Sequence, residues 1–145
     1  MNNSTEPLAV AIVSVVKHDY VARGILSHTG FKPVVVTDDE DSPDWVHARN
    51  QKFADEFKIP YVRGLEGALE EHPVDVAVVS SEAERHCDQS VRAAQAGAHI
   101  VQDKPMSTVL SECDRVIDAV EEYGVKFLMW NRNFLPAIIH AEQII

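Results

Sequence analysis

Residues 74–107 read VDVAVVSSEAERHCDQSVRAAQAGAHIVQDKPMS and decide the fold, because they hold a strand, a helix and a second strand in succession. The valine-rich run at residues 74–80 is typical of a strand buried on both faces. Residues 84–96 carry a helical pattern that Gly97 ends, and Ile100–Val101 form the next strand. This order predicts two parallel strands joined by a right-handed crossover.

The same alternation runs through the rest of the chain. Further strands are predicted at residues 8–13, 31–37, 61–62 and 125–130, and further helices at residues 19–29, 44–57, 64–72 and 108–124. Repeated strand–helix alternation predicts an α/β fold with a doubly wound parallel sheet, the Rossmann-like arrangement that binds dinucleotides. We assign residues 7–131 to this domain. Residues 132–145 end on an apolar helical pattern without a cap, so we expect them to begin a connection into a second domain absent from this chain.

Two of the helical patterns indicate which face each helix buries. At residues 44–57 the apolar residues that fall roughly on one face are Trp45, Ala48, Phe53 and Phe57. At residues 108–124 the apolar stripe is Val109, Cys113, Val116, Ile117 and Val120. We expect both faces to pack against the sheet.

Composition excludes several classes of partner. The 145 residues carry a net charge of −10, and no cluster of Lys and Arg is available to neutralise a nucleic acid. No apolar run approaches the ~20 residues of a membrane span, and the start MNNSTEP lacks the basic and apolar regions of a signal peptide. Cys87 and Cys113 lack metal-ligand spacing. We therefore expect a cytoplasmic protein with free thiols, no bound metal, and neither nucleic acid nor membrane as partner.

The turn after the first strand lacks the glycines that dinucleotide-binding domains use to approach a diphosphate. It reads SVVKHD from Ser14 to Asp19, and the three glycine positions hold Ser14, Val16 and Asp19. Either Ser14, Lys17 and His18 donate hydrogen bonds to the phosphates in a modified way, or the turn no longer binds a nucleotide. The turn by itself leaves both interpretations open.

The end of the second strand indicates which dinucleotide would bind. Asp38 lies some twenty residues after the turn, where an acid accepts hydrogen bonds from the adenosine ribose. Asp39, Glu40 and Asp41 follow it, and their negative charge would repel a 2′-phosphate, so NAD is favoured over NADP. The simpler interpretation of these three residues is a solvated acidic loop.

A lysine follows the strand that contains Ile100 and Val101. Residues at the carboxyl ends of parallel strands face the crevice in which ligands bind. Because proline restricts the residue before it to extended conformations, Pro105 limits the backbone of Lys104, and Asp103 could tune its charge. The competing interpretation is a turn that begins a helix, with Lys104 in solvent.

Residues 74–107 resemble the signature region of the glucose–fructose oxidoreductase / inositol dehydrogenase / rhizopine-catabolism (Gfo/Idh/MocA) family. His86 matches the family's histidine, AGAH at residues 96–99 replaces Ala-Gly-Lys-His, and DKP at residues 103–105 replaces Glu-Lys-Pro. The segment MWNRNFLP at residues 129–136 is similar to the family's Asn-Arg-Arg-Phe-x-Pro. The resemblance runs from about Val10 to the last residue.

The resemblance implies an enzyme, an NAD(P)-dependent oxidoreductase that transfers a hydride between a nicotinamide cofactor and an alcohol, diol or cyclic polyol carbon. Lys104 would hydrogen-bond the reacting oxygen and help move its proton. Asp103 would accompany it, and His86 would line the nicotinamide pocket. Relatives with this sort of turn look like dihydrodiol dehydrogenases of aromatic catabolism, which suggests a cyclohexadiene dihydrodiol as substrate.

The resemblance also implies further cofactor contacts and a second domain. Ser80 and Ser81 would contact the cofactor, and Arg132 would reach the cofactor or the small-molecule substrate. The family's second domain supplies more catalytic residues and a homo-oligomer interface, so we expect this chain alone to be inactive. The missing glycines, and Glu82 in place of the family's proline, keep an alternative open: a non-catalytic binding or regulatory module.

Overall fold

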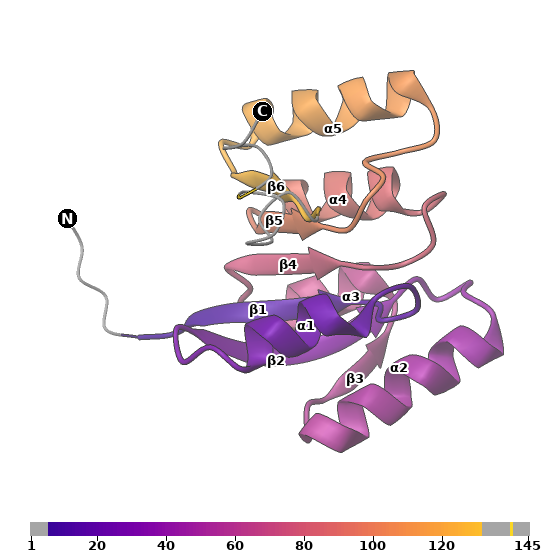
Figure 1. The fold of residues 1–145 in the computed structure, drawn as a ribbon, viewed down its shortest axis with the longest axis vertical. Helices are drawn as coiled ribbons and strands as arrows, with labels where there is room; N and C mark the ends of the chain where they lie inside the picture. The colour runs from indigo at the N-terminus through magenta and orange to yellow at the C-terminus, as the bar shows by residue number, and fades with distance from the viewer. Residues whose placement is uncertain (1–5, 132–139, 141–145) are drawn as a thin grey trace.

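The computed structural model describes residues 6–131 and residue 140. They form one parallel six-stranded sheet in the order β3-β2-β1-β4-β5-β6, with helices on both faces (Figure 1). The strands are β1 (Leu8–Val13), β2 (Phe31–Asp38), β3 (Tyr61–Arg63), β4 (Val76–Val79), β5 (His99–Gln102) and β6 (Phe127–Met129). The helices are α1 (Asp19–Leu26), α2 (Asp44–Phe57), α3 (Leu65–Glu71), α4 (His86–Gln95) and α5 (Leu110–Glu122).

The doubly wound parallel sheet predicted from the sequence is confirmed, and each predicted element is present within a few residues of its expected bounds. Arg132 and nearly all of the predicted connection at residues 132–145 lie outside the described residues. Within the described part of the chain, no helix has the length and apolar character that crossing a membrane requires.

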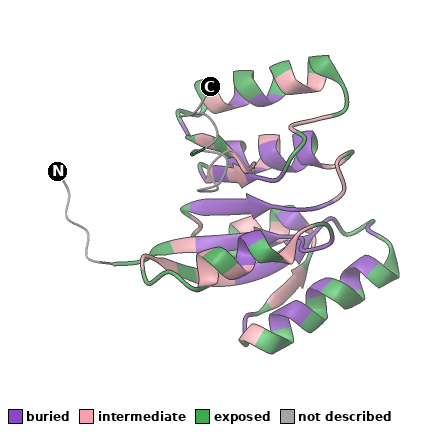
Figure 2. Ribbon diagram, viewed as in Figure 1, coloured by how far each residue is buried: buried purple, intermediate pink, exposed green. Residues whose placement is uncertain are grey.

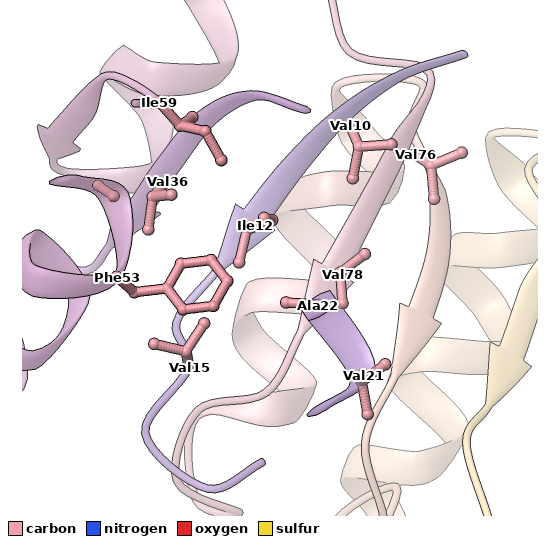
Figure 3. Close-up of a cluster of buried hydrophobic side chains, with 11 residues drawn as sticks. Val10, Ile12, Val15, Val21, Ala22, Val36, Phe53, Ile59, Val76 and Val78 are labelled. Carbon is pink, nitrogen blue, oxygen red and sulfur yellow. The ribbon is translucent and has the colours of Figure 1, made fainter. Parts of the chain in front are cut away.

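The strand β1 lies at the centre of the sheet and pairs with both β2 and β4. Its residues Val10–Val13 are fully buried, because helices cover both faces of the sheet at this position. On one face, α1 and α2 contribute Val21, Ala22 and Phe53 to the cluster drawn in Figure 3. On the other face, α3, α4 and α5 bury leucine and alanine side chains against the sheet.

Parallel pairing brings the carboxyl ends of the strands to one edge of the sheet, where this fold binds ligands. Ser14 follows β1, Asp38 ends β2, Ser80 follows β4 and Asp103 follows β5. All four side chains are buried. The strands therefore place a buried polar residue at each of four neighbouring positions along this edge.

The buried face of α2 differs from the one predicted. Trp45 is 58% exposed and Ala48 is exposed, whereas Val46, Asn50 and Phe53 are buried. The prediction of an apolar face through Trp45 was wrong because the buried face includes a polar residue, Asn50, which apolar periodicity does not count.

The apolar stripe predicted for α5 is also only partly correct. Val116 is buried and Val120 is half-buried, but Val109 and Ile117 are 48% and 46% exposed. The helix lies at the margin of the molecule and turns a narrow face, which includes the buried Ala119, toward α4 and the sheet (Figure 2).

We expect Phe53→Ala to lower the free energy of unfolding by about 3–5 kcal/mol, because it removes a buried aromatic ring and leaves a cavity. Trp45→Ala on the same helix is the control, and we expect a change within about 0.5 kcal/mol because Trp45 is exposed. Urea denaturation followed by circular dichroism measures both. Equal losses in the two variants would contradict the assigned face of α2.

Candidate functional site

The turn after β1 keeps the backbone shape of a glycine turn without a glycine. Ser14 has a φ of 65°, in the left-handed region that glycine adopts most readily. Its amide donates to the carbonyl of Thr37 at 2.8 Å, and its hydroxyl lies 3.4 Å from Nδ2 of Asn50. Ser14 therefore adopts, with a side chain, a backbone conformation that glycine takes most readily.

Most backbone amides of this turn are already hydrogen-bonded inside the protein. The amide of Val15 donates to Oδ1 of Asn50 at 2.9 Å. The amides of Lys17 and His18 donate to the carbonyl and hydroxyl oxygens of Ser80 at 3.2 and 3.3 Å. Among the described residues of this turn, the amides of Val16 and Asp19 have no acceptor. A diphosphate at this turn would meet these two amides, the second at the start of α1, and the side chain of Lys17, which is exposed.

The carboxylate of Asp38 is fully buried and surrounded by donors. Its Oδ1 accepts from the Asp39 amide, the Ser42 hydroxyl and Nε2 of Gln89 at 2.8, 3.1 and 3.1 Å. Its Oδ2 accepts from Nδ2 of Asn50 at 2.8 Å. Oδ2 therefore accepts fewer hydrogen bonds than Oδ1 and keeps a lone pair that no donor among the described residues uses.

Of the three acidic residues after β2, Glu40 and Asp41 are exposed, as the simpler interpretation expects, but Asp39 is not solvated. Asp39 is only 8% exposed and is paired with Arg85 at 2.9 Å and Arg92 at 2.5 Å. Burial raises the pKa of Asp39, but the hydrogen bonds from Arg92 and Arg85 outweigh it and hold the pKa below its ordinary value. Arg85 also pairs with Asp41, and Arg92 with Glu66, each at 2.7 Å. Both guanidinium groups are therefore already ion-paired with carboxylates.

Lys104 borders a cavity at the carboxyl edge of the sheet. The cavity measures about 310 Å³ and is lined by Lys104, His18, Tyr20, Trp130 and Asn131. The rings of Tyr20 and Trp130 meet edge to face, with centroids 6.2 Å apart. The Lys104–Pro105 peptide bond is cis. The cavity thus combines one ammonium group, one imidazole and two aromatic rings.

The carboxylate of Asp103 contacts His18, one of the residues that line this cavity. Its side chain is fully buried, and its Oδ2 contacts Nδ1 of His18. The hydroxyl of Ser80 lies 3.3 Å from the same oxygen, and Oδ1 accepts from the Lys104 amide at 2.8 Å. Ser80, Asp103, Lys104 and His18, all predicted from the sequence, are therefore in one place.

His86 and Ser81 are directed into the protein. The ring nitrogens of His86 lie 2.8 Å from the carbonyl oxygen of Pro105 and 3.1 Å from that of Ser81. The Ser81 hydroxyl donates to Oε1 of Gln89 at 2.6 Å. In this arrangement neither ring nitrogen of His86 is left for a ligand, and the ring connects the β4–α4 loop to the turn that carries Lys104.

An unpaired donor bears on whether the site fits a nicotinamide cofactor. Nε1 of Trp130 is buried and has no hydrogen-bond partner among the described residues, although the indole lines the cavity. An unpaired buried donor is costly unless a ligand supplies an acceptor. One wall of the cavity therefore contains a donor without an acceptor among the described residues, while the adenosine end offers Asp38 and few free amides.

Sequence reasoning missed three residues of the site. Tyr20 and Trp130 are the aromatic walls of the cavity, and the position of Trp130 directly after a strand is the one available signal. Asn50 joins the turn after β1 to Asp38, but nothing in its local sequence distinguishes it from a solvated residue of α2.

The comparisons with known proteins agree with this geometry. The family model described as "Oxidoreductase family, NAD-binding Rossmann fold" matches residues 43–131. A dTDP-3,4-didehydro-2,6-dideoxy-alpha-D-glucose 3-reductase from Actinomadura kijaniata is 31% identical over 94 residues, which are 65% of this chain and 28% of that protein. Inositol 2-dehydrogenase from Salmonella typhimurium is 23% identical over 137 residues, which are 92% of this chain and 39% of that protein.

Solved structures share the fold. GenD2 from gentamicin A biosynthesis, in complex with NAD, superimposes with a TM-score of 0.84 at 22% identity, over 96% of this chain and 39% of that one. Biliverdin reductase from Synechocystis, in complex with biliverdin and NADP+, gives 0.80 at 19% identity, over 95% and 42%. This chain therefore spans well under half the length of the proteins that it resembles.

We expect Asn50→Ala to lower the free energy of unfolding by about 1–3 kcal/mol, because it leaves the buried Val15 amide without its acceptor. Gln51→Ala is the matched control on the same helix. Gln51 is exposed and bonds only the exposed side chain of Asp55, so we expect a change within about 0.5 kcal/mol. Urea titration compares them. An Asn50 variant as stable as the control would show that Asn50 does not hold the turn.

Proposed function

Because this chain belongs to the Gfo/Idh/MocA family of oxidoreductases, we propose that residues 7–131 are the dinucleotide-binding domain of an NAD-dependent dehydrogenase. The observation that carries the proposal is the cavity at the carboxyl edge of the sheet, which Lys104 borders and whose wall contains the unpaired donor of Trp130. This edge is where doubly wound sheets hold a dinucleotide. The bound nicotinamide would supply the hydride acceptor.

We propose that the substrate is a small molecule with an alcohol or cyclic polyol carbon. The support is chemical: Lys104 offers an ammonium group that can hydrogen-bond an alcohol or carbonyl oxygen. Inositol 2-dehydrogenase, a polyol enzyme by its name, and a sugar-nucleotide reductase are both among the relatives. The dihydrodiol of aromatic catabolism has no comparable support and is not part of the proposal.

The residues of this chain would divide the work as follows. Lys104 would bind the reacting oxygen and stabilise the negative charge that develops on it. Asp38 would accept a ribose hydroxyl through Oδ2, and Lys17 with the Val16 amide would face the diphosphate. His86 would act as a positioning residue, since its ring holds the carbonyl of Pro105, next to Lys104. A homo-oligomer through a further domain is the corresponding proposal for the whole protein.

We propose NAD rather than NADP as the cofactor. A 2′-phosphate is bound most strongly by guanidinium groups, which pair with two of its oxygens. Arg85 and Arg92, two of the arginines near the end of β2, are already paired with Asp39, Asp41 and Glu66. The negative charge of the exposed Glu40 is added to this edge, where the exposed Arg63 pairs with Asp38 in the sheet. A 2′-phosphate bound by Arg85 or Arg92 would have to displace their carboxylates.

One observation favours a second candidate, a binding or regulatory module that has lost its nucleotide. Three amides of the turn after β1 are bonded internally, to Asn50 and Ser80, and so are not available to phosphates. A protein of this kind would keep the fold and the cavity but would not need the ammonium group of Lys104.

Isothermal titration with NADH separates the two candidates. For a dehydrogenase we expect binding in the range of typical substrate constants, about 1 μM to 1 mM. In the whole protein, Lys104→Ala should lower kcat for polyol oxidation by about 10²- to 10⁴-fold, the usual contribution of a proton-transfer group. Lys32→Ala, an exposed lysine at the amino end of β2, is the control and should leave kcat unchanged. No heat with millimolar NADH would contradict the proposal.

The choice between NAD and NADP has its own test. Asp39→Asn removes the charge that Arg85 and Arg92 share, so each guanidinium group loses one carboxylate partner, while Arg85 keeps Asp41 and Arg92 keeps Glu66. We expect the ratio of the NADPH to the NADH dissociation constant to fall by about tenfold, the effect of one gained charge-assisted hydrogen bond of about 1.5 kcal/mol. Asp118→Asn on the exposed side of α5 should leave the ratio unchanged. If the ratio of dissociation constants is unchanged in both variants, the ion pairs of Asp39 with Arg85 and Arg92 do not determine the choice between NAD and NADP.

A further inference from the structure

We propose that His18 accepts the proton of the substrate hydroxyl, and that Asp103 is the positioning residue that holds His18 for this step. This inference rests on the dehydrogenase function proposed above. Two observations carry it: Nδ1 of His18 contacts the carboxylate of Asp103, and the imidazole lines the same cavity as Lys104.

The imidazole is fixed from two sides. The Asp103 side chain is fully buried and is itself held by the Lys104 amide at 2.8 Å. Ser80 clamps the backbone of His18, accepting from its amide at 3.3 Å and lying 3.1 Å from its carbonyl oxygen. The ring of Tyr20 lies against the imidazole, with centroids 5.0 Å apart. His18 therefore presents one orientation to the cavity.

The contact with Asp103 decides which nitrogen carries the proton. A carboxylate only accepts, so Nδ1 of His18 must be the N–H donor of the neutral ring. The lone pair is then on Nε2, which makes no hydrogen bond to another described residue. When Nε2 takes up a proton, the ring becomes a cation while its Nδ1–H still donates to the buried carboxylate.

Lys104 and His18 complement each other in the proposed reaction. A lysine that is an ammonium ion has no lone pair, so it can hydrogen-bond the substrate oxygen but cannot take a proton from it. The hydroxyl proton would pass to Nε2 of His18 as the C–H electron pair leaves as hydride to NAD+, and the C–O bond becomes a carbonyl. The His18 side chain is 28% exposed, so the proton can then leave to solvent. In the reverse direction the imidazolium donates the proton.

The sequence suggested a different role for His18, a hydrogen bond to phosphate. The geometry favours the proton-transfer role, because Nδ1 is occupied by Asp103 and the ring shares its cavity with Lys104. The neighbouring Lys17, which is exposed, remains the phosphate donor of the turn.

Two other histidines of the chain serve as internal controls for the tautomer. Nδ1 of His28 accepts from the Gly30 amide at 3.0 Å, and Nδ1 of His99 accepts from the Lys126 amide at 3.2 Å. Both rings must therefore carry their proton on Nε2, opposite to the expectation for His18.

Long-range 1H–15N correlation spectra of the histidine-labelled chain, above the pH at which imidazoles are protonated, test the assignment without cofactor or substrate. We expect the Nδ1–H form at His18 and the Nε2–H form at His28 and His99. His18 in the Nε2–H form would overturn the pairing with Asp103. The wild-type protein gives the answer, so the result does not depend on whether an Asp103 variant folds.

The second test measures whether Nε2 of His18 faces the cofactor site. Diethyl pyrocarbonate modifies unprotonated imidazole nitrogens, and peptide mapping separates His18 from the others. With NADH at ten times its dissociation constant, we expect modification of His18 to slow about tenfold, since the fraction of free sites falls in that proportion. His28, exposed and distant at the α1–β2 loop, should be unaffected.

His18→Gln in the whole protein separates the inference from the proposed function. We expect the NADH dissociation constant to change by less than about twofold while kcat falls by about 10²- to 10⁴-fold, the contribution of a general base. If NADH binds and Lys104→Ala abolishes turnover while His18→Gln does not, the inference is wrong and the dehydrogenase stands. If NADH does not bind, the dehydrogenase itself is wrong, whichever tautomer His18 adopts.

Discussion

Two buried carboxylates organise the carboxyl edge of this sheet. Asp38 at the end of β2 and Asp103 after β5 are both withdrawn from solvent, and a buried charge is tolerated only where donors surround it. Asp38 draws donors from α2 and α4, and Asp103 draws the imidazole of His18 and the amide of Lys104. The loops around the site are therefore held in place by the hydrogen bonds that the carboxylates of Asp38 and Asp103 accept.

This constraint explains how the turn after β1 holds its backbone conformation without glycines. Asn50 accepts from the turn and donates to Asp38, so one side chain of α2 fixes both the turn and the acid that follows β2. Ser80 does the same between the turn and the Asp103 carboxylate. With those bonds in place, the turn does not need free amides or small residues to hold its shape. The same hydrogen bonds leave fewer amide donors for a phosphate. An amide that holds the turn in place is therefore not available to bind an anion.

The sequence was sufficient for the fold and for placing Ser80, Asp103 and Lys104 at one edge of the sheet, but insufficient for the contacts. Valine-rich strands and glycine-terminated helices are local signals, so the order of elements and the edge that carries Lys104 could be predicted. The buried face of α2 could not, because Asn50 is buried to satisfy Asp38, a residue of another element. The burial of Asp39 could not be predicted either, because its two arginine partners, Arg85 and Arg92, follow β4 and are more than 40 residues away in the sequence. In each case a polar side chain is buried because it pairs with a polar group of another element, and the apolar periodicity of its own helix or loop does not reveal that partner.

His18 illustrates the same limit at the centre of the site. Its position in the turn indicated a phosphate donor, because the turn is where phosphates lie in this fold. Its partner Asp103 is 85 residues further along the chain and belongs to the segment that was assigned to Lys104. Once strand pairing brings the two segments together, a histidine with one occupied nitrogen and one free nitrogen stands beside an ammonium group. The reaction that we propose would move a hydride and a proton and would need those two functions in one cavity. In that proposal the contact between His18 and Asp103, which sequence reasoning missed, carries more of the chemistry than the motif that it found.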